Sequence, residues 1–135
     1  MPNVKILKKS IIIILTAIAL LIGHQLFFSR PEVRNSEPTG ENIICFGDSL
    51  TFGTGAAENM DYPSQLSRML SRRIINAGVP GDTTAMALAR LYEDVLSRSP
   101  RIVLITLGGN DLKNRIAKET AHQNLKEIIA TIQEQ

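Results

Sequence analysis

Three short segments of the sequence combine glycine with small polar side chains, and each directly follows a run of apolar residues. They contain Ser49, Gly81 and Asn110. A serine between a strand and a helix suits a nucleophile, because its own N–H and the helix end favour the negative charge that develops there. Gly81 offers an unshielded N–H and Asn110 a side-chain amide, so the three could surround the oxyanion of an acyl-transfer reaction.

Other interpretations of these segments have less support. Ser49 could simply cap a helix, a common role for serine. The glycines after Phe46 do not form G-x-G-x-x-G. A P-loop is excluded because five residues, not four, separate two of them and no lysine follows. His24 and His122 lie far apart in the sequence and in no cluster of ligands, so we predict neither a metal site nor a cofactor.

The elements that must position these residues follow from the apolar pattern. Three short segments are predicted strands. Ile43–Phe46 is a continuous apolar run typical of a strand buried on both faces, Ile74–Asn76 is a second candidate, and Ile102–Leu107 is a third, apolar one. Apolar residues recur at helical spacing over 62–73, 83–97 and 118–133. The alternation predicts an α/β fold, an incomplete doubly wound, flavodoxin-like parallel sheet with helices on both faces. The three segments should then converge at the carboxyl ends of the strands.

The sequence resembles the GDSL, or SGNH, hydrolases, whose first three conserved blocks are matched in order by FGDSLTFG, INAGVPGDTT and TLGGNDL. The resemblance covers about Ile43 to Gln133 and is greatest to the bacterial thioesterase/lysophospholipase-like and arylesterase-like enzymes. It implies an ester or thioester hydrolase that acts on a small acyl substrate. Ser49 would be its nucleophile, and Gly81 and Asn110 would serve its oxyanion hole.

The match to this family is incomplete. Asp48 and Asp111 occupy motif positions, where we expect them to brace turns rather than take part in the chemistry. The family's last block, an Asp-x-x-His that supplies the base and its orienting acid, has no match in the 135 residues. His122 lies in a helical segment between Ala121 and Gln123, and we expect it to be solvated there. The catalytic His and Asp are therefore absent, and we expect this chain to be nearly inactive.

The predicted domain, residues 42–135, is also short for the fold. A five-stranded sheet of this kind needs on the order of 150 residues, against 94 here. We expect the N-terminal part of a longer enzyme: a fragment, a frameshifted reading frame or a degraded gene. Ile102–Leu107 would then be an exposed apolar edge. A non-catalytic acyl-binding pseudoenzyme or gene remnant is the alternative; the substrate's acyl chain and the oligomeric state stay open.

The N-terminal segment, residues 1–41, differs from the rest. Residues 1–10 carry three lysines and precede an apolar run without formal charge, Ile11–Phe28. At about 1.5 Å per residue this run spans about 27 Å, close to a bilayer core. We expect an uncleaved transmembrane signal anchor, a linker over 29–41, and a hydrolase part that faces the periplasm or exterior. Signal cleavage and secretion is the alternative.

Charge and cysteine content limit the possible partners. Residues 29–135 carry 12 basic and 13 acidic side chains, a net charge of −1, so the pI near 8.9 comes from the N-terminal tail. Nucleic acid would need a clustered basic surface, which this balance argues against. Cys45 is the only cysteine, and its apolar neighbours predict a buried thiol rather than a nucleophile.

Overall fold

The computed structural model describes residues 13–20 and 37–134. Residues 13–20 are helical and exposed. No helix within these two ranges is long and apolar enough to cross a membrane, and the rest of the predicted span 11–28 lies outside them. The chain divides into two units, Met1–Val33 and Arg34–Gln135, and the second holds everything described below.

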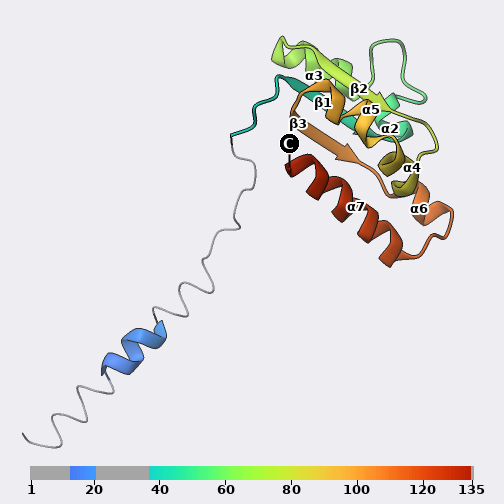
Figure 1. Cartoon of the computed structure of the whole chain (residues 1–135). Coiled ribbons are helices and arrows are strands. Elements are labelled where there is room, and N and C mark those ends of the chain that lie inside the picture. The colour runs from blue at the N-terminus through green and yellow to red at the C-terminus, as the bar shows by residue number, and fades with distance from the viewer. Residues whose placement is uncertain (1–12, 21–36, 135) are drawn as a thin grey trace, which may run out of the picture. The chain divides into compact units, whose positions relative to one another are not determined.

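Three parallel strands form one sheet in the spatial order β2-β1-β3 (Figure 1). They are β1 (Asn42–Gly47), β2 (Ile74–Gly78) and β3 (Pro100–Thr106). In the central strand, Ile43 lies opposite Ile74 on one side and Ile102 on the other. Every residue of β1 after Asn42 is buried, as the continuous apolar run predicted.

Helices follow each strand, as the alternation in the sequence predicted. They are α2 (Ser49–Phe52) and α3 (Tyr62–Leu70) after β1; α4 (Thr84–Ala89), α5 (Leu91–Asp94) and the 3-10 helix η1 (Leu96–Arg98) after β2; and α6 (Gly109–Lys113) and α7 (Lys118–Gln133) after β3. The α/β class and the parallel sheet are therefore confirmed. The strand order matches the first three positions of a flavodoxin-like sheet.

Both faces of the sheet carry helices. One face holds the main core, in which β1 packs against the segments after β2 and α7. Its buried members are Ile44, Phe46, Ala77, Ala87, Leu91, Val95 and Ile128. On the other face, the Cys45 thiol lies beside the Tyr62 hydroxyl of α3. The alternation of β1 side chains between these two faces is why the whole strand is apolar.

The helix predicted over residues 83–97 is broken into α4, α5 and η1. Arg90, between α4 and α5, has φ −103° and ψ 6°, and Val95, before η1, has φ −127°. Both lie outside the helical region. Apolar periodicity records which side of a segment is buried, so it could not reveal these breaks.

Strand β3 forms one edge of the described sheet. It begins at Pro100, two residues earlier than predicted, and proline is tolerated as the first residue of a strand. Ile102 and Leu104 are 46% and 37% exposed. Within residues 37–134, the expected apolar edge is therefore present.

Candidate active site

Ser49 is the first residue of α2 and lies directly beyond β1. The N-cap of this helix is Asp48, whose carboxylate accepts a hydrogen bond of 2.9 Å from the Leu50 N–H. Asp48 thus fills the capping role that the sequence left open for Ser49. The hydroxyl and the backbone N–H of Ser49 have no hydrogen-bond partner in the part of the chain that the structure describes. Both groups are available for a further hydrogen bond.

Two glycines hold α2 close to the ends of β1 and β2. A Cβ on Gly47 would overlap the side chain of Thr51, and a Cβ on Gly78 would overlap the backbone nitrogen of Phe52. Side chains are therefore excluded at both positions. This close fit fixes the place of Ser49 at the edge of the sheet.

The loop after β2 turns back over the end of β1 and carries Gly81. The Val79 N–H donates to the Gly47 carbonyl at 2.9 Å, and the Asp82 N–H donates to the Val79 carbonyl at 3.2 Å. Gly81 has φ +89°, and a Cβ built on it would meet no atom within 4 Å. Its N–H finds no acceptor among residues 37–134, so the loop presents an unshielded donor.

The third segment, α6 and the residues before it, is tied to the other two. Asn110 donates a hydrogen bond of 2.8 Å from Nδ2 to the Asp82 carbonyl, next to Gly81. This bond uses one amide hydrogen, and the second remains for another acceptor. The Asp48 N–H donates to the Thr106 carbonyl at 3.3 Å. The structure thus brings all three predicted segments to one edge of the sheet.

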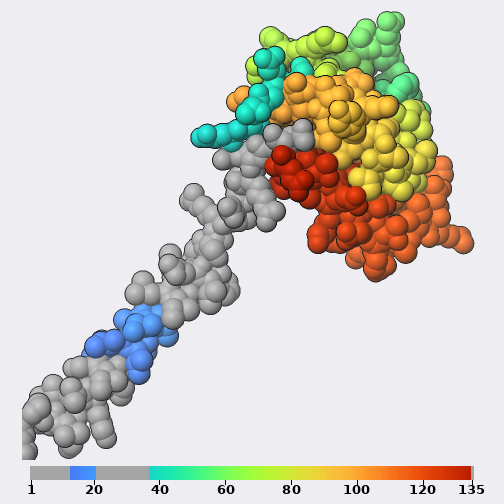
Figure 2. All heavy atoms as spheres, viewed as in Figure 1, coloured from blue at the N-terminus to red at the C-terminus, as the bar shows by residue number. Residues whose placement is uncertain are grey.

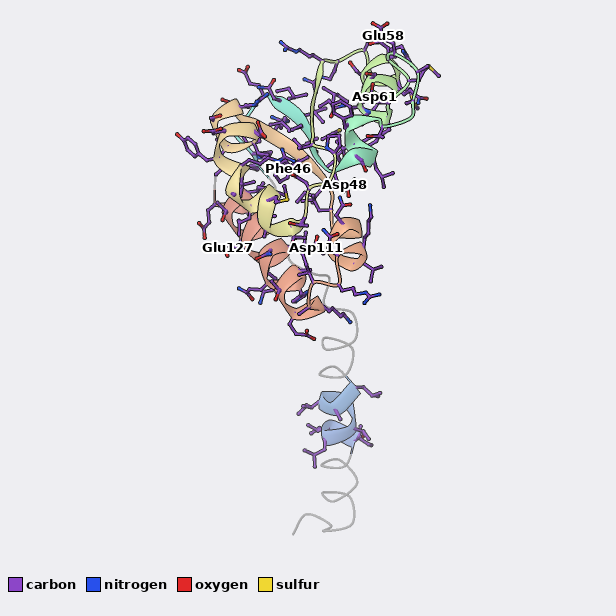
Figure 3. The ribbon with its side chains drawn as sticks, turned by 90° about the vertical axis from the view of Figure 1, so that its right-hand side faces the viewer. Phe46, Asp48, Glu58, Asp61, Asp111 and Glu127 are labelled. Carbon is purple, nitrogen blue, oxygen red and sulfur yellow. The ribbon has the colours of Figure 1, made fainter. Side chains whose placement is uncertain are left out.

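Asp111 is buried and contacts α4. Its carboxylate accepts from the Thr84 N–H at 2.9 Å and from the Thr84 hydroxyl at 2.6 Å. Asn124 of α7 donates to the same hydroxyl at 3.0 Å. Figure 3 shows Asp48 at the end of β1 and Asp111 on α6. Asp48 caps α2, and the contacts of Asp111 and Thr84 join α4, α6 and α7.

Arg90 was not among the residues predicted from the sequence. Its guanidinium donates to the carbonyls of Gly47 at 2.9 Å and Ala77 at 3.0 Å, near the ends of β1 and β2. It also donates to the carboxylates of Asp82 at 2.6 Å and Asp94 at 2.8 Å. Only the i,i+4 spacing of Arg90 and Asp94 could have indicated part of this role. Arg90 fixes the loop of Gly81 to both strands.

No histidine in the described ranges contacts Ser49. His122 lies on α7, where it lines a surface cavity of about 250 Å³ with Lys118 and Glu119. His24 falls outside the described residues. Within those ranges, therefore, Ser49 has no side chain that could accept its proton.

Two further titratable groups, one on β1 and one on α3, lie on the face of the sheet opposite the main core. Cys45 is a free, buried thiol, and burial raises its pKa, which disfavours the reactive thiolate. Burial also raises the pKa of Tyr62, whose hydroxyl lies 3.1 Å from the Thr51 hydroxyl. No group of three or more His, Cys, Asp or Glu that could hold a metal ion occurs in the described part.

Comparisons with known proteins show that the chain is similar to acyl hydrolases. Residues 45–135 match the model of the GDSL-like lipase/acylhydrolase family. The chain is 30% identical over 94 residues to thioesterase 1/protease 1/lysophospholipase L1 of Escherichia coli (strain K12), which covers 68% of this chain and 45% of that protein. It is 32% identical over 119 residues to an arylesterase of Vibrio mimicus, covering 84% and 58%. The chain spans about half the length of the curated relatives it matches.

Solved structures share the fold. The crystal structure of AlinE4, an SGNH-hydrolase family esterase, is 39% identical with a TM-score of 0.66, over 73% of this chain and 56% of that one. The crystal structure of TesA is 29% identical with a TM-score of 0.66, over 70% and 55%. The three-stranded parallel sheet and its helices are thus similar to part of a longer chain in both structures.

Proposed function

The chain belongs to the GDSL-like lipase/acylhydrolase family, which comprises carboxylic ester and thioester hydrolases, and we propose that Ser49 is its nucleophile. The observation that supports this is a set of unused polar groups at one edge of the sheet. The Ser49 hydroxyl and N–H and the Gly81 N–H lack partners within residues 37–134, and Asn110 has a spare amide hydrogen. An acyl substrate supplies the electrophile and the acceptor that these groups require.

In the proposed reaction, Ser49 Oγ attacks the carbonyl carbon of an ester or thioester, and its proton passes to a base. The carbonyl oxygen becomes an oxyanion, which receives hydrogen bonds from the Ser49 and Gly81 N–H groups and the Asn110 amide. The alcohol or thiol then leaves with a proton, and an acyl-serine remains. Water then attacks the acyl-serine, which releases the acid and restores the Ser49 hydroxyl.

The 135 residues contain no Asp-x-x-His, so this polypeptide by itself should turn over slowly. Removing the histidine base from a serine hydrolase costs on the order of 10⁶ in kcat. We therefore propose that residues 1–135 bind and orient an acyl substrate but hydrolyse it at a small fraction of the rate of family members that contain this block. A non-catalytic acyl-binding role is the second candidate, favoured by the free Ser49 hydroxyl without a base.

The nucleophile can be tested by supplying the base from solution. The chain is incubated with p-nitrophenyl acetate, with and without imidazole, and acetylation of each serine is followed by peptide mass spectrometry. We expect acetyl-Ser49 to form about tenfold or more faster with imidazole, because imidazole accepts the proton that no described side chain can accept. No acetylation of Ser49 under either condition would refute the proposed nucleophile and leave the acyl-binding role.

Two variants serve as controls for this experiment. Ser49→Ala should abolish the imidazole-dependent reaction. Ser64→Ala should leave it unchanged, because Ser64 also lies in the first turn of a helix but donates its hydroxyl to Asp61 at 2.7 Å. If the chain instead hydrolyses the ester rapidly without imidazole and loses that activity in Ser49→Ala, the proposed low activity is wrong.

We also propose that residues 11–28 anchor the protein in a membrane, with the hydrolase part in the periplasm or exterior. Support comes from the uncharged apolar run and the three preceding lysines. An anchored chain stays with the membrane fraction after alkaline carbonate extraction, whereas a chain cleaved after a signal appears in the soluble fraction with a shorter mass. The second result would favour secretion.

A further inference from the structure

A polar cavity of about 540 Å³ lies at the amino ends of the strands, the edge of the sheet opposite Ser49. We call it the arginine cavity. Its lining residues are Gly40, Glu41, Asn42, Arg72, Arg73 and Arg101. These residues precede or begin β1, β2 and β3, and none of them belongs to the candidate active site. The candidate active site therefore does not account for this cavity.

The three arginines of the cavity are exposed and form no ion pair in the part of the chain that the structure describes. By contrast, Arg90 and Arg98 are both paired with carboxylates. Glu41 is the single acidic residue of the lining, so positive charge is in excess. The net charge of −1 over residues 29–135 could not indicate this local cluster, because a net charge sums the charges on all faces of the domain. Arginine clusters suit phosphate, which guanidinium binds through two parallel hydrogen bonds.

The chain segment that leads into the domain is fixed at the rim of this cavity. The N–H groups of Glu41 and Asn42 both donate to the Ser99 carbonyl, at 3.0 and 3.1 Å. A Cβ on Gly40 would overlap the carbonyl of Pro100, so the backbone lies directly on the segment before β3. Figure 2 shows the teal atoms of the segment around residue 40 beside orange atoms of the segment around residue 100. Any tether that precedes residue 40 must therefore arrive here.

We propose that the arginine cavity binds the phosphate headgroups of anionic phospholipids; this inference rests on the membrane anchoring proposed above. The linker over 29–41 has 13 residues, and a chain of that length reaches at most about 45 Å. Because this linker enters the domain at the rim of the cavity, anionic headgroups beside the proposed anchor lie within reach of the arginines. Each arginine near an anionic surface contributes about fivefold to binding.

The orientation has a consequence for the substrate. The six residues of β1 separate the cavity from Ser49 by about 20 Å along the strand. With the cavity on the headgroups, Ser49 faces away from the bilayer. The acyl ester or thioester would then approach from the aqueous phase, whereas lipids of the same membrane would lie on the wrong side of the sheet.

Hydrogen exchange on the full chain in vesicles tests this inference. The chain is reconstituted in phosphatidylcholine vesicles and in vesicles that contain 30 mol% phosphatidylglycerol. We expect backbone exchange at residues 40–42 and 72–73 to slow about tenfold in the anionic vesicles, and the effect to vanish in 0.5 M NaCl because salt screens surface charge. Slow exchange at residues 11–28 in both vesicles reports the anchor independently, so a failed anchor and a failed cavity give different results.

Matched variants identify the groups responsible. Arg73→Gln with Arg101→Gln should remove the slowing, whereas Lys118→Gln with Lys126→Gln, which removes the same charge from α7, should preserve it. Equal exchange of the wild type in both vesicles would overturn the inference, as would slowing that survives in the arginine variant. If inorganic phosphate in phosphatidylcholine vesicles reproduces the effect, the ligand is a free anion and the assignment to lipid is wrong.

Discussion

At the scale of single residues, Arg90 organises the site although it carries no chemistry of its own. Its guanidinium lies 4.5 Å from the centroid of the Phe46 ring, within the range of a cation–π interaction, in addition to its four hydrogen bonds. One of its partners, Asp82, is almost wholly buried. A buried carboxylate without its cation is costly, so the stability of the loop depends on this arginine.

We expect Arg90→Ala to lower the free energy of unfolding by about 3 kcal/mol, because it leaves the Asp82 carboxylate buried and unpaired. Urea unfolding followed by circular dichroism measures the change. Arg98→Ala is the matched control, since Arg98 also pairs with Asp94 but is 43% exposed; it should cost less than about 0.5 kcal/mol. Equal losses in the two variants would contradict the role assigned to Arg90.

The sequence could predict those residues of the site that a local pattern marks, namely a position shortly after an apolar strand. Ser49, Gly81 and Asn110 each follow an apolar strand, and parallel strands bring such segments to one edge. Apart from its i,i+4 partner Asp94, Arg90 could not be predicted in this way, because its other partners lie at the ends of β1 and β2 and in the loop after β2. Contacts of that kind depend on the tertiary arrangement, which periodicity does not record.

At the scale of elements, α3 depends on one carboxylate at its start. Asp61 accepts hydrogen bonds from the Ser64 N–H at 2.9 Å and the Ser64 hydroxyl at 2.7 Å. Burial by itself would raise the pKa of Asp61, but these hydrogen bonds outweigh it and hold the pKa below its ordinary value. The ionised form is therefore the one that stabilises the helix.

This cap should make stability fall in acid. Because the pKa of Asp61 is lower in the folded state, its contribution is complete above about pH 4 and is lost as the pH falls through the folded value. We expect the unfolding midpoint in urea to drop more between pH 7 and pH 3 in the wild type than in Asp61→Asn, which caps without titrating. Glu58→Gln, at an exposed carboxylate in the preceding loop, should behave like the wild type.

The fit of α2 against the sheet predicts unequal effects at two glycines. Gly78→Ala should cost about 3 kcal/mol, because its Cβ would overlap the backbone of Phe52. Gly81→Ala should cost only about 1 kcal/mol, the strain of a left-handed conformation in open space. Thermal unfolding compares the two variants. A larger loss at Gly81 would show that the loop, rather than α2, is the tightly packed element.

The sequence predicted the strands more completely than the helix over residues 83–97, and the reason is physical. β1 and β3 contain continuous apolar runs that were visible in the sequence, and β2 was indicated by Ile74 and Ile75. The helix over residues 83–97 was predicted as one piece, because Leu88, Leu91 and Val95 keep helical spacing across the breaks. The segment is divided into α4, α5 and η1, and Arg90 makes its contacts at the first of these breaks. The spacing of apolar residues carries no information about such contacts.

At the scale of the whole molecule, the exposed apolar residues of β3 should cause self-association. An unpaired, apolar edge strand is a template for another chain. We expect the double variant Ile102→Lys and Leu104→Lys to shift the chain toward monomer by at least about twofold in analytical ultracentrifugation in detergent. Leu112→Lys, an 82% exposed apolar residue on α6, should leave the distribution unchanged. Association that persists in the β3 variant would locate the contact elsewhere.

The central position of β1 also determines when the sheet can assemble during synthesis. Ile43 pairs with Ile74 and with Ile102, and the ribosome adds both of these residues after it. At about 5 to 20 residues per second, roughly 3 to 12 s pass between translation of the first strand and of its second partner. Through that interval one side of a wholly buried strand has no partner. We therefore expect the nascent chain to expose an apolar strand edge, a surface that chaperones bind, until β3 has been synthesised.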